Sequence, residues 1–473
     1  MSSARAFALD DQVWFAAASG DFNPFHIDPA SARRSTSGVP AVHGVHLLLW
    51  ALNEAVRGRV DRVSASFDAP VRVGEDVSLE VGDATVRILA GPRPAATMRY
   101  VLGGGSPRDS GRTATDNFAT AQPRELSWAD LANLRESADA PLASRNLVER
   151  YPHAAASLGG DGFAGLVAIT RVVGMRCPGL HSLLVGLDVS FNDAREDPVR
   201  TLDYEVTRAD QRFSLVTMSV KASGMAGTVR AFVRPPPVQQ RSMAELRSLV
   251  RANEFRGHKV LVVGGSRGLG EAAVKVLALG GADVTFTYAR GQSDARRVGD
   301  EVRALGGRAA ARHLDVTEPG AVAAALGDLD GLSAVLYCAV APIRFGRPAL
   351  FDVAEFNRHA AVAVGGAAQV ATFLSARALP MAPFIYPSSV ILDSPQDGAP
   401  EYRAAKAAGE ALWSSLAAGH PNLQFVAIRL PRMLTDQTAT TLQSVRASDA
   451  SDIALQSLRG LRWPQPAAAR QQA

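Results

Sequence analysis

The sequence predicts two fold classes in one chain, an α+β region in the first half and a doubly wound parallel α/β sheet in the second. Two observations lead to this prediction. The first half twice shows an apolar helix followed by several short strand-like runs. In the second half, strand-like runs alternate with helical patterns, and the first strand leads into a glycine-rich loop. We therefore expect more than one hydrophobic core.

Length and composition are typical of several globular domains. The chain has 473 residues, and a usual domain size of about 150 residues predicts three domains. Hydrophobic residues make up 47% and charged residues 20% of the chain, as in soluble proteins. No apolar run approaches the ~18 residues of a membrane helix, and Met1–Gln12 lacks a signal-peptide pattern. We expect a cytoplasmic protein without a membrane span.

Charge and cysteine content argue against other classes of function. The formal net charge is only +4 and the arginines are dispersed, so no nucleic-acid binding is expected. Cys177 and Cys338 are the only cysteines, and each lies in an apolar stretch. We therefore expect neither a disulfide nor a metal site.

Residues 19–28 contain two potential acid–base groups, Asp21 and His26. Between them lie Asn23 and Pro24, which favour a turn, and Pro24 also moves Asn23 out of the helical region. The backbone must therefore bend, and the bend lets the two ionisable side chains converge.

This stretch resembles the signature of the R-specific enoyl-CoA hydratases, also called hydratase 2 or MaoC-like proteins, which have the hotdog fold. That signature reads Ser/Thr-Gly-Asp-x-Asn-Pro-hydrophobic-His-x-Asp, and the chain matches it at Ser19, Gly20, Asp21, Asn23, Pro24, Phe25, His26 and Asp28. The family's His-Gly pair at the head of the central helix is present as His43 and Gly44. The resemblance implies a catalytic site in which Asp21 and His26 divide the acid and base roles in an order that the sequence leaves open. Asn23 would orient the pair, and the N–H of Gly44 at a helix N-terminus would stabilise the thioester oxyanion.

The rest of the first half follows the hotdog order of one helix and then strands. We expect the helix over Ala41–Val56, strands at Val63–Phe67, Val77–Val81 and Ala96–Val101, and a loop over Gly103–Thr115.

From Leu126 the pattern repeats without the catalytic signature. An apolar helix is expected from Phe163 to about Val173, followed by strands that reach Val233. Asp161 and His181 are the possible remnants of a second site, and we interpret them as structural. We therefore predict a double hotdog, because pairing two lobes covers the edge and the helix face that one lobe leaves open.

Consecutive prolines within residues 234–240 mark a linker, because they stiffen an extended chain. A short amphipathic helix is expected over Ser242–Ala252, before a strand at Lys259–Val263. That strand runs into a glycine-rich loop and a helix over Glu271–Leu279, an arrangement that holds a nucleotide pyrophosphate. The predicted cofactor-binding residues here are Gly264, Ser266, Arg267, Gly268, Leu269 and Gly270.

Later strands are expected at Asp283–Tyr288 and Ala334–Cys338, and Asp315 with Val316 follows another. We place Asp315 and Val316 among the cofactor-binding residues. The alternation of strands and helices implies a Rossmann-type sheet.

Tyr402 lies thirteen positions after Ser389, and Lys406 lies four positions after Tyr402. This pattern resembles the short-chain dehydrogenase/reductase family, in which Tyr-x-x-x-Lys lies on a helix and the Ser at a strand end. Spacing by four puts Tyr402 and Lys406 on one helix face, where the ammonium group could lower the pKa of the phenol. The resemblance implies that Ser389, Tyr402 and Lys406 are catalytic and that Tyr402 and Lys406 also contact the cofactor.

Two departures from that family's pattern weigh against full reductase activity. Val340 ends a segment that replaces the family's Asn-Asn-Ala-Gly, and Ala363 stands where an Asn joins a proton relay. After the second strand there is no acidic residue to hold a ribose hydroxyl, whereas Arg290 and Arg267 suit a 2′-phosphate. We therefore expect NADPH as the cofactor.

The predicted organisation is a hotdog lobe with the hydratase/dehydratase signature at 1–120, a second, non-catalytic hotdog lobe at 121–234, a linker and helix at 235–257, and a short-chain dehydrogenase/reductase domain at 258–473. The chain would reduce a 3-oxoacyl thioester and then dehydrate the (3R)-hydroxyacyl product. The substrate would be carried by coenzyme A or acyl carrier protein, and a homodimer would form through the reductase domain. Two alternatives remain: enoyl-CoA hydration with 3-hydroxyacyl-CoA oxidation, and a non-catalytic acyl- and NADPH-binding module.

Overall fold

The computed structural model describes residues 4–111, 113–114, 118–193, 200–344, 351–377, 382–393, 398–420, 423–439 and 446–464. The loop expected over Gly103–Thr115 and the end of the segment expected at 258–473 lie partly outside these residues. The described chain falls into two compact units, which divide between Pro236 and Pro237. Each unit has its own sheet and its own hydrophobic core.

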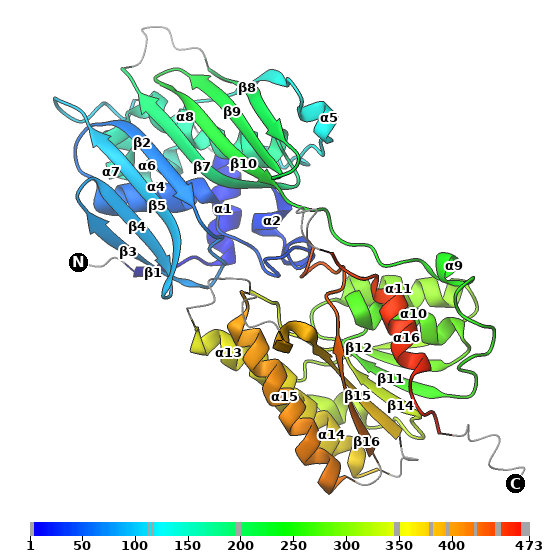
Figure 1. Cartoon of the computed structure of the whole chain (residues 1–473). Coiled ribbons are helices and arrows are strands. Elements are labelled where there is room, and N and C mark those ends of the chain that lie inside the picture. The colour runs from blue at the N-terminus through cyan, green and yellow to red at the C-terminus, as the bar shows by residue number, and fades with distance from the viewer. Residues whose placement is uncertain are drawn as a thin grey trace, which may run out of the picture. The chain divides into compact units, whose positions relative to one another are not determined.

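The first unit is built on one antiparallel sheet of ten strands (Figure 1). The strand order is β1–β3–β4–β5–β2–β7–β10–β9–β8–β6. In sequence order the strands are β1 (Ala4–Ala6), β2 (Val60–Phe67), β3 (Asp76–Gly82), β4 (Thr85–Ala90), β5 (Arg93–Leu102), β6 (Arg135–Asp139), β7 (Ser182–Phe191), β8 (Thr201–Asp210), β9 (Leu215–Ala222) and β10 (Met225–Val233).

The two halves of this sheet repeat one arrangement, a buried apolar helix beside antiparallel strands. We call β1–β5 with the helices before residue 60 the first lobe, and β6–β10 with the helices from residue 128 to 176 the second lobe. Helix α4 (Gly44–Ala55) and helix α8 (Gly160–Arg171) are the central helices, and they contact each other on one side of the sheet. Strand β2 pairs with β7, with Ala65 opposite Leu187, so the sheet is continuous between the lobes.

The apolar sequence of α4 explains its position. Its residues from Val45 to Leu52 are all buried, and each fully buried leucine contributes about 1.5–3 kcal/mol. The helix starts at Gly44, three residues later than expected. Strand β4 was not expected, although Val86 and Ile88 alternate with polar residues and are buried.

Shorter helices complete the first unit. They are α1 (Leu9–Ser19), α2 (Pro24–Ile27), α3 (Pro29–Ala32), α5 (Trp128–Leu131), α6 (Arg145–Arg150), α7 (Pro152–Leu158) and the π-helix η1 (Val172–Arg176), which continues α8. In the described part of the chain no single helix is long and apolar enough to cross a membrane. One pair, α7 with α8 and η1, passes that test only when the two are taken together, and it is bent by 109°.

The second unit contains a parallel sheet of six strands, as predicted. The order is β13–β12–β11–β14–β15–β16, with bounds β11 (Lys259–Val263), β12 (Asp283–Tyr288), β13 (Arg308–His313), β14 (Ala334–Tyr337), β15 (Ala382–Ser389) and β16 (Leu423–Leu430). Alternate residues of β11 enter different cores, Val260 and Val262 on one face and Leu261 and Val263 on the other. Both faces of the sheet are therefore covered, as in a doubly wound fold.

The helices of the second unit are α9 (Met243–Leu246), α10 (Gly268–Leu279), α11 (Gln292–Ala304), α12 (Ala321–Leu326), α13 (Val353–Ala360), the π-helix η2 (Ala361–Gly366), α14 (Ala367–Ser375), the 3₁₀-helix η3 (Val390–Asp393), α15 (Pro400–Gly419) and α16 (Ala450–Arg459). The helix expected over Ser242–Ala252 is only the single turn α9. Ser242 caps this turn by accepting a hydrogen bond from the N–H of Glu245, but turns replace the helix after Leu246.

Candidate active sites

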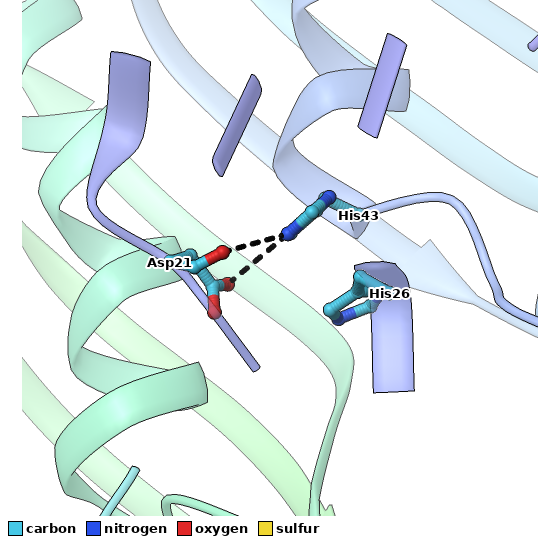
Figure 2. A group of neighbouring side chains, drawn as sticks. All are labelled: Asp21, His26 and His43. Carbon is cyan, nitrogen blue, oxygen red and sulfur yellow. Dashed lines mark hydrogen bonds and ion pairs between the residues drawn. The ribbon is translucent and has the colours of Figure 1, made fainter. Parts of the chain in front are cut away.

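Asp21, His26 and His43 form a cluster in the first unit (Figure 2). Asp21 follows Gly20, which ends α1 with a φ of 76°. His26 lies on α2, and His43 immediately precedes α4. One polar atom from each side chain lies within 4.8 Å of those of the other two. The structure therefore brings together Asp21 and His26, as the sequence predicts, and adds His43.

Asp21 is almost fully buried, and burial raises the pKa of its carboxyl group to about 7. Its Oδ2 accepts a hydrogen bond from Thr170 Oγ1 at 2.7 Å, and its Oδ1 accepts one from the N–H of Asn23 at 3.2 Å. Both bonds favour the carboxylate and hold the pKa below the value that burial alone would give. The group can therefore exist in either protonation state near neutral pH.

His26 is held in one tautomer. Its Nδ1 lies 2.8 Å from the carbonyl oxygen of Ala41, which can only accept, so Nδ1 carries the hydrogen and Nε2 has the lone pair. Burial, together with the nearby charge of Arg234, lowers the pKa of His26 to about 4. At neutral pH the ring is a neutral base.

A cavity connects these groups. It is lined from both lobes by Asp21, His26, Val42, Gly44, Leu47, Phe67, Asp68, Ala69, Pro70, Val71, Thr170, Val173, Gly174, Ser182, Leu183, Leu184, Val185 and Phe232. Gly44 is the first residue of α4, and the first N–H groups of a helix have no partner within that helix. A side chain on Gly44 would press against Leu184 and Phe67, so glycine keeps this end of the cavity open.

The side chain of Asn23 makes its contacts with the second lobe and with α2. Its side-chain amide donates to the carbonyl oxygens of Gly174, at 2.9 Å, and Gly179, at 3.1 Å, and its Oδ1 caps α2 by accepting from the N–H of Phe25. The amide hydrogens are therefore directed to the second lobe and not to Asp21 or His26. Asn23 holds the loop on which Asp21 and His26 lie, and its own N–H donates to Asp21 Oδ1 at 3.2 Å; its orienting role stays a prediction.

Three residues of this site were missed in the sequence. Thr170 and Gly174 belong to the second lobe, and a side chain on Gly174 would overlap the carboxylate of Asp21. Gln12, on α1, contacts His43. Their separation in sequence left no local signal, except that Thr170 is a polar residue in an apolar helix.

Asp161 and His181, the possible remnants of a second site, have structural partners. Asp161 pairs with Arg200 at 2.7 Å and accepts a hydrogen bond from Ser223. His181 pairs with Glu125 at 3.1 Å. These contacts fit the prediction that Asp161 and His181 are structural residues.

In the second unit, Ser389, Tyr402 and Lys406 lie together at the ends of β15 and α15. Tyr402 forms a side-chain hydrogen bond with Ser389, and Ser389 Oγ also accepts from the N–H of Ile391 at 3.2 Å. Lys406 Nζ donates to the carbonyl oxygen of Pro387 at 2.6 Å. These contacts hold the three predicted side chains in one place.

The expected lowering of the pKa of Tyr402 does not occur. Burial raises it to about 12, while burial lowers the pKa of Lys406 to about 8. The ammonium nitrogen lies 5.7 Å from the ring centre of Tyr402 and closer, at 4.5 Å, to that of Tyr386. At this distance desolvation outweighs the charge of the lysine.

Ala363 and Val340, the two departures from the family pattern, differ in their burial. Ala363 is buried in η2, where the helix widens although the Asn is missing, and the carbonyl oxygen of Val362 accepts a hydrogen bond from Tyr337 at 2.6 Å. Val340 is 38% exposed after β14. The structure also places His359 against Tyr402, with ring centres 5.6 Å apart.

The glycine loop fits a pyrophosphate. Gly264 has a φ of 81°, and a side chain there would press on the backbone of Ala339. A side chain on Gly270 would overlap the carbonyl oxygen of Gly264. Arg267 is the N-cap of the 12-residue helix α10, and its side chain makes no capping bond. A helix N-terminus of this kind suits a phosphate group.

The predicted cofactor residues around this loop have the following places. Ser266 is half-buried in the loop, Leu269 is half-buried in the first turn of α10, and Val316 is buried. Asp315 accepts two hydrogen bonds from Thr317.

The two arginines expected near a 2′-phosphate differ from each other. Arg290 is exposed after β12. Arg267 pairs with Asp436 at 3.2 Å and with Asp294 at 3.8 Å. A bound phosphate at Arg267 would therefore compete with two carboxylates.

Comparison with known proteins identifies both parts of the chain. Residues 2–91 match the MaoC like domain family, and residues 258–446 match the short chain dehydrogenase family. The (R)-specific enoyl-CoA hydratase of Aeromonas caviae is 36% identical over 100 residues, which are 20% of this chain and 72% of the hydratase. The fatty acid synthase beta subunit stcK of Emericella nidulans is 35% identical over 74 residues, 14% of this chain and 4% of that subunit.

Solved structures also match part of the chain. A short-chain dehydrogenase/reductase from Serratia marcescens is 24% identical, covers 45% of this chain and 93% of its own, and has a TM-score of 0.41. The angucycline C-6 ketoreductase LanV with bound NADP is 19% identical, covers 44% of this chain and 90% of its own, and has a TM-score of 0.40. The chain belongs to the MaoC-like hydratase family through its N-terminal part, and its C-terminal part is a short-chain dehydrogenase domain.

Proposed function

We propose that the chain is a bifunctional enzyme that reduces a 3-oxoacyl thioester with NADPH and then removes water from the (3R)-hydroxyacyl product. The observation that carries this proposal is the cavity onto which Asp21, His26 and Gly44 open together. A neutral base, a weak acid and a helix N-terminus around one cavity suit the loss of water next to a thioester carbonyl.

The protonation states of Asp21 and His26 assign the acid and base roles that the sequence left open. His26 Nε2 takes the proton from Cα, because the ring is neutral and its Nδ1–H is fixed on Ala41. The Cβ–O bond breaks as Asp21 gives its proton to the leaving hydroxyl group, so water departs and the Cα=Cβ bond forms. The active form holds one proton on the Asp21–His26 pair, and the reverse hydration requires the same total.

The first unit is a double hotdog in this proposal. Support comes from its two central helices, α4 and α8, and from the β2–β7 pairing that joins their strands. The second lobe supplies Thr170 and Gly174 to the site of the first. The proposed domains are those expected from the sequence, with the second lobe lacking an acid–base pair of its own.

In the reductase, bound NADPH supplies the hydride for the carbonyl carbon. Tyr402 donates its phenolic proton to the carbonyl oxygen, and Ser389 holds that oxygen by a hydrogen bond. Lys406, fixed on Pro387, favours the tyrosinate that remains. The glycine loop and the α10 N-terminus would hold the pyrophosphate of this cofactor, and Arg267 and Arg290 would bind its 2′-phosphate.

The carrier of the acyl group is coenzyme A or acyl carrier protein. The hydratase of Aeromonas caviae and the fatty acid synthase subunit of Emericella nidulans both carry names from acyl metabolism, which supports a thioester substrate. The proposed assembly is a homodimer through the reductase unit, where Phe351 and Val353 are exposed apolar side chains. Light scattering on the purified chain tests the dimer.

The test is incubation of the protein with acetoacetyl-CoA and NADPH, followed by NADPH absorbance and product mass. The wild type should oxidise NADPH and form the enoyl thioester. Asp21→Asn should stop at the hydroxyacyl product, whereas Tyr402→Phe should oxidise no NADPH and still hydrate crotonyl-CoA.

Matched controls separate chemistry from folding. Asp68→Asn changes an exposed carboxylate that lines the same cavity, and Tyr288→Phe changes a half-buried tyrosine on β12. Both controls should retain both steps. Loss of both activities in Asp21→Asn, or dehydration at the wild-type rate in that variant, would contradict the assignment.

A further inference from the structure

His43 is surrounded by oxygen atoms at both ring nitrogens, although the proposed dehydration gives it no role. Its Nδ1 lies 2.9 Å from Gln12 Oε1, and its Nε2 lies 3.1 Å from the carbonyl oxygen of Asp21 and 3.9 Å from Asp21 Oδ2 (Figure 2). His43 and Gln12 are fully buried. Every polar contact of this ring is therefore made with protein and not with bulk water.

The orientation of Gln12 follows from the backbone. The N–H of His43 can only donate, and it points to Gln12 at 3.0 Å, so the oxygen and not the amide nitrogen must lie there. The same oxygen then faces His43 Nδ1, which must carry a hydrogen. Gln12 Nε2 is buried and has no hydrogen-bond partner among the described residues. The amide is thus held by its oxygen alone.

With Nδ1–H fixed, Nε2 is the nitrogen that can gain or lose a proton, and it faces Asp21. A neutral ring would turn the lone pair of Nε2 toward a carbonyl oxygen, and two acceptors at 3.1 Å repel each other. A proton at Nε2 relieves this contact and lies beside the carboxylate. Asp21 Oδ2 lies 3.9 Å from this nitrogen and is therefore an acid–base group with which Nε2 can share a proton.

We propose that His43, oriented by Gln12, is a positioning residue that shares one proton with Asp21 and so determines when Asp21 can act as the acid. This inference rests on the proposed dehydratase function. No ligand is added to the site. His43 is a second place where the proton of the proposed acid, Asp21, can lie.

The surrounding charges allow only one extra proton in this cluster. On α2, the ring of His26 stacks on His43 with centres 3.9 Å apart. On α4, His46 Nδ1 lies 3.4 Å from the same Gln12 oxygen. His46 Nε2 lies 2.8 Å from the hydroxyl group of Tyr151, which has the charged Arg5 and Arg150 as neighbours. Burial, and after it the neighbouring His26 and His46, lower the pKa of His43. In this proposal His43 therefore holds the proton only while Asp21 is ionised.

The proton balance closes over one turnover. The Asp21–His43 pair begins with one shared proton, and that proton leaves on the hydroxyl group as water. His26 takes one proton from Cα and releases it to the solvent, while the pair takes one proton back from the solvent. The sum is the loss of water alone.

Two substitutions of Gln12 test the idea through the pH dependence of kcat/KM for crotonyl-CoA hydration. Gln12→Met has a similar volume but cannot accept from Nδ1–H, so the pair should hold its proton less tightly and the alkaline limb should move down by about one to two pH units. Gln12→Glu should move the limb up. If His43 is only a packing residue, Gln12→Met leaves the limb in place.

Ring ¹⁵N resonances of His43, assigned with His43→Asn, give an independent readout. Nδ1 should stay protonated at every pH, and Nε2 should lose its partial protonation at the pH of the alkaline limb. Tyr151→Phe, which changes a group that reaches Asp21 only through His46 and Gln12, should shift nothing.

The outcomes separate the two proposals. Wild-type protein that hydrates no enoyl thioester refutes the dehydratase, while the ¹⁵N titration still tests the shared proton. Active wild type with an unprotonated Nε2 at every pH, or with an unmoved limb in Gln12→Met, refutes the role of His43 alone.

Discussion

Replacing Thr170 by valine should raise the pKa of Asp21 and shift the activity of the first site to higher pH. Thr170 Oγ1 donates to Asp21 Oδ2 at 2.7 Å, and both residues are buried. Valine has nearly the same shape as threonine but no hydroxyl group. The substitution therefore removes a hydrogen bond that stabilises the carboxylate and leaves the packing almost unchanged.

The size of the shift follows from this one bond. A hydrogen bond to a charged group is worth about 1.5–3 kcal/mol, and one pKa unit corresponds to about 1.4 kcal/mol. The pKa of Asp21, raised by burial to about 7, should therefore rise by about one to two further units. Because the carboxylate is the form that loses its partner, the shift can only be upward.

The measurement is kcat/KM for crotonyl-CoA hydration across pH, which reports the ionisations of the free enzyme. In the wild type the alkaline limb should fall near the pKa of Asp21, because the one-proton form of the pair is lost there. Thr170→Val should move this limb up and leave the acidic limb, set by His26, in place. Thr170→Ser retains the hydroxyl group and serves as the control. An unmoved alkaline limb in an active valine variant would refute the assignment of Asp21.

Three further predictions concern single contacts. Gly174→Ala should abolish hydration and spare NADPH oxidation, because its side chain would overlap the carboxylate of Asp21; equal loss of both activities would indicate misfolding. Asp436→Asn should tighten NADPH binding more than NADH binding, measured by fluorescence titration, because Arg267 loses a competing carboxylate. Treatment with a chelator should leave hydration unchanged, since we assign the cluster to acid–base chemistry; loss restored by a divalent metal would overturn that assignment.

Where neighbouring residues determine a structure, the sequence was sufficient. The bounds of β11 and β12 were predicted without error, because β11 is an apolar run that ends at Gly264 and β12 alternates Val, Phe and Tyr with threonine. The convergence of Asp21 and His26 follows from a turn that Asn23 and Pro24 impose within ten residues. Ser389, Tyr402 and Lys406 are likewise linked through a strand end and one helix turn.

Contacts between distant segments could not be read in the same way. Thr170 lies 149 residues from Asp21 in sequence, and its helix shows only an apolar pattern. The side-chain partners of Asn23 could not be predicted for the same reason, since they include carbonyl groups of the second lobe. The pKa of Tyr402 was misjudged because the spacing of two residues on a helix does not reveal how far burial outweighs a nearby charge.

The second lobe has a chemical consequence for the first site. Asp21 is 1% exposed, and segments of the second lobe lie directly against it, with Thr170 in contact and Gly174 leaving room for its carboxylate. Without the second lobe, the carboxyl group of Asp21 would be exposed to water, and its pKa would return toward the ordinary value of 3.8. A carboxylate with that pKa is ionised at neutral pH and cannot protonate a leaving hydroxyl group. A lobe without an acid–base pair of its own therefore supplies the low-polarity surroundings on which the proposed acid, Asp21, depends.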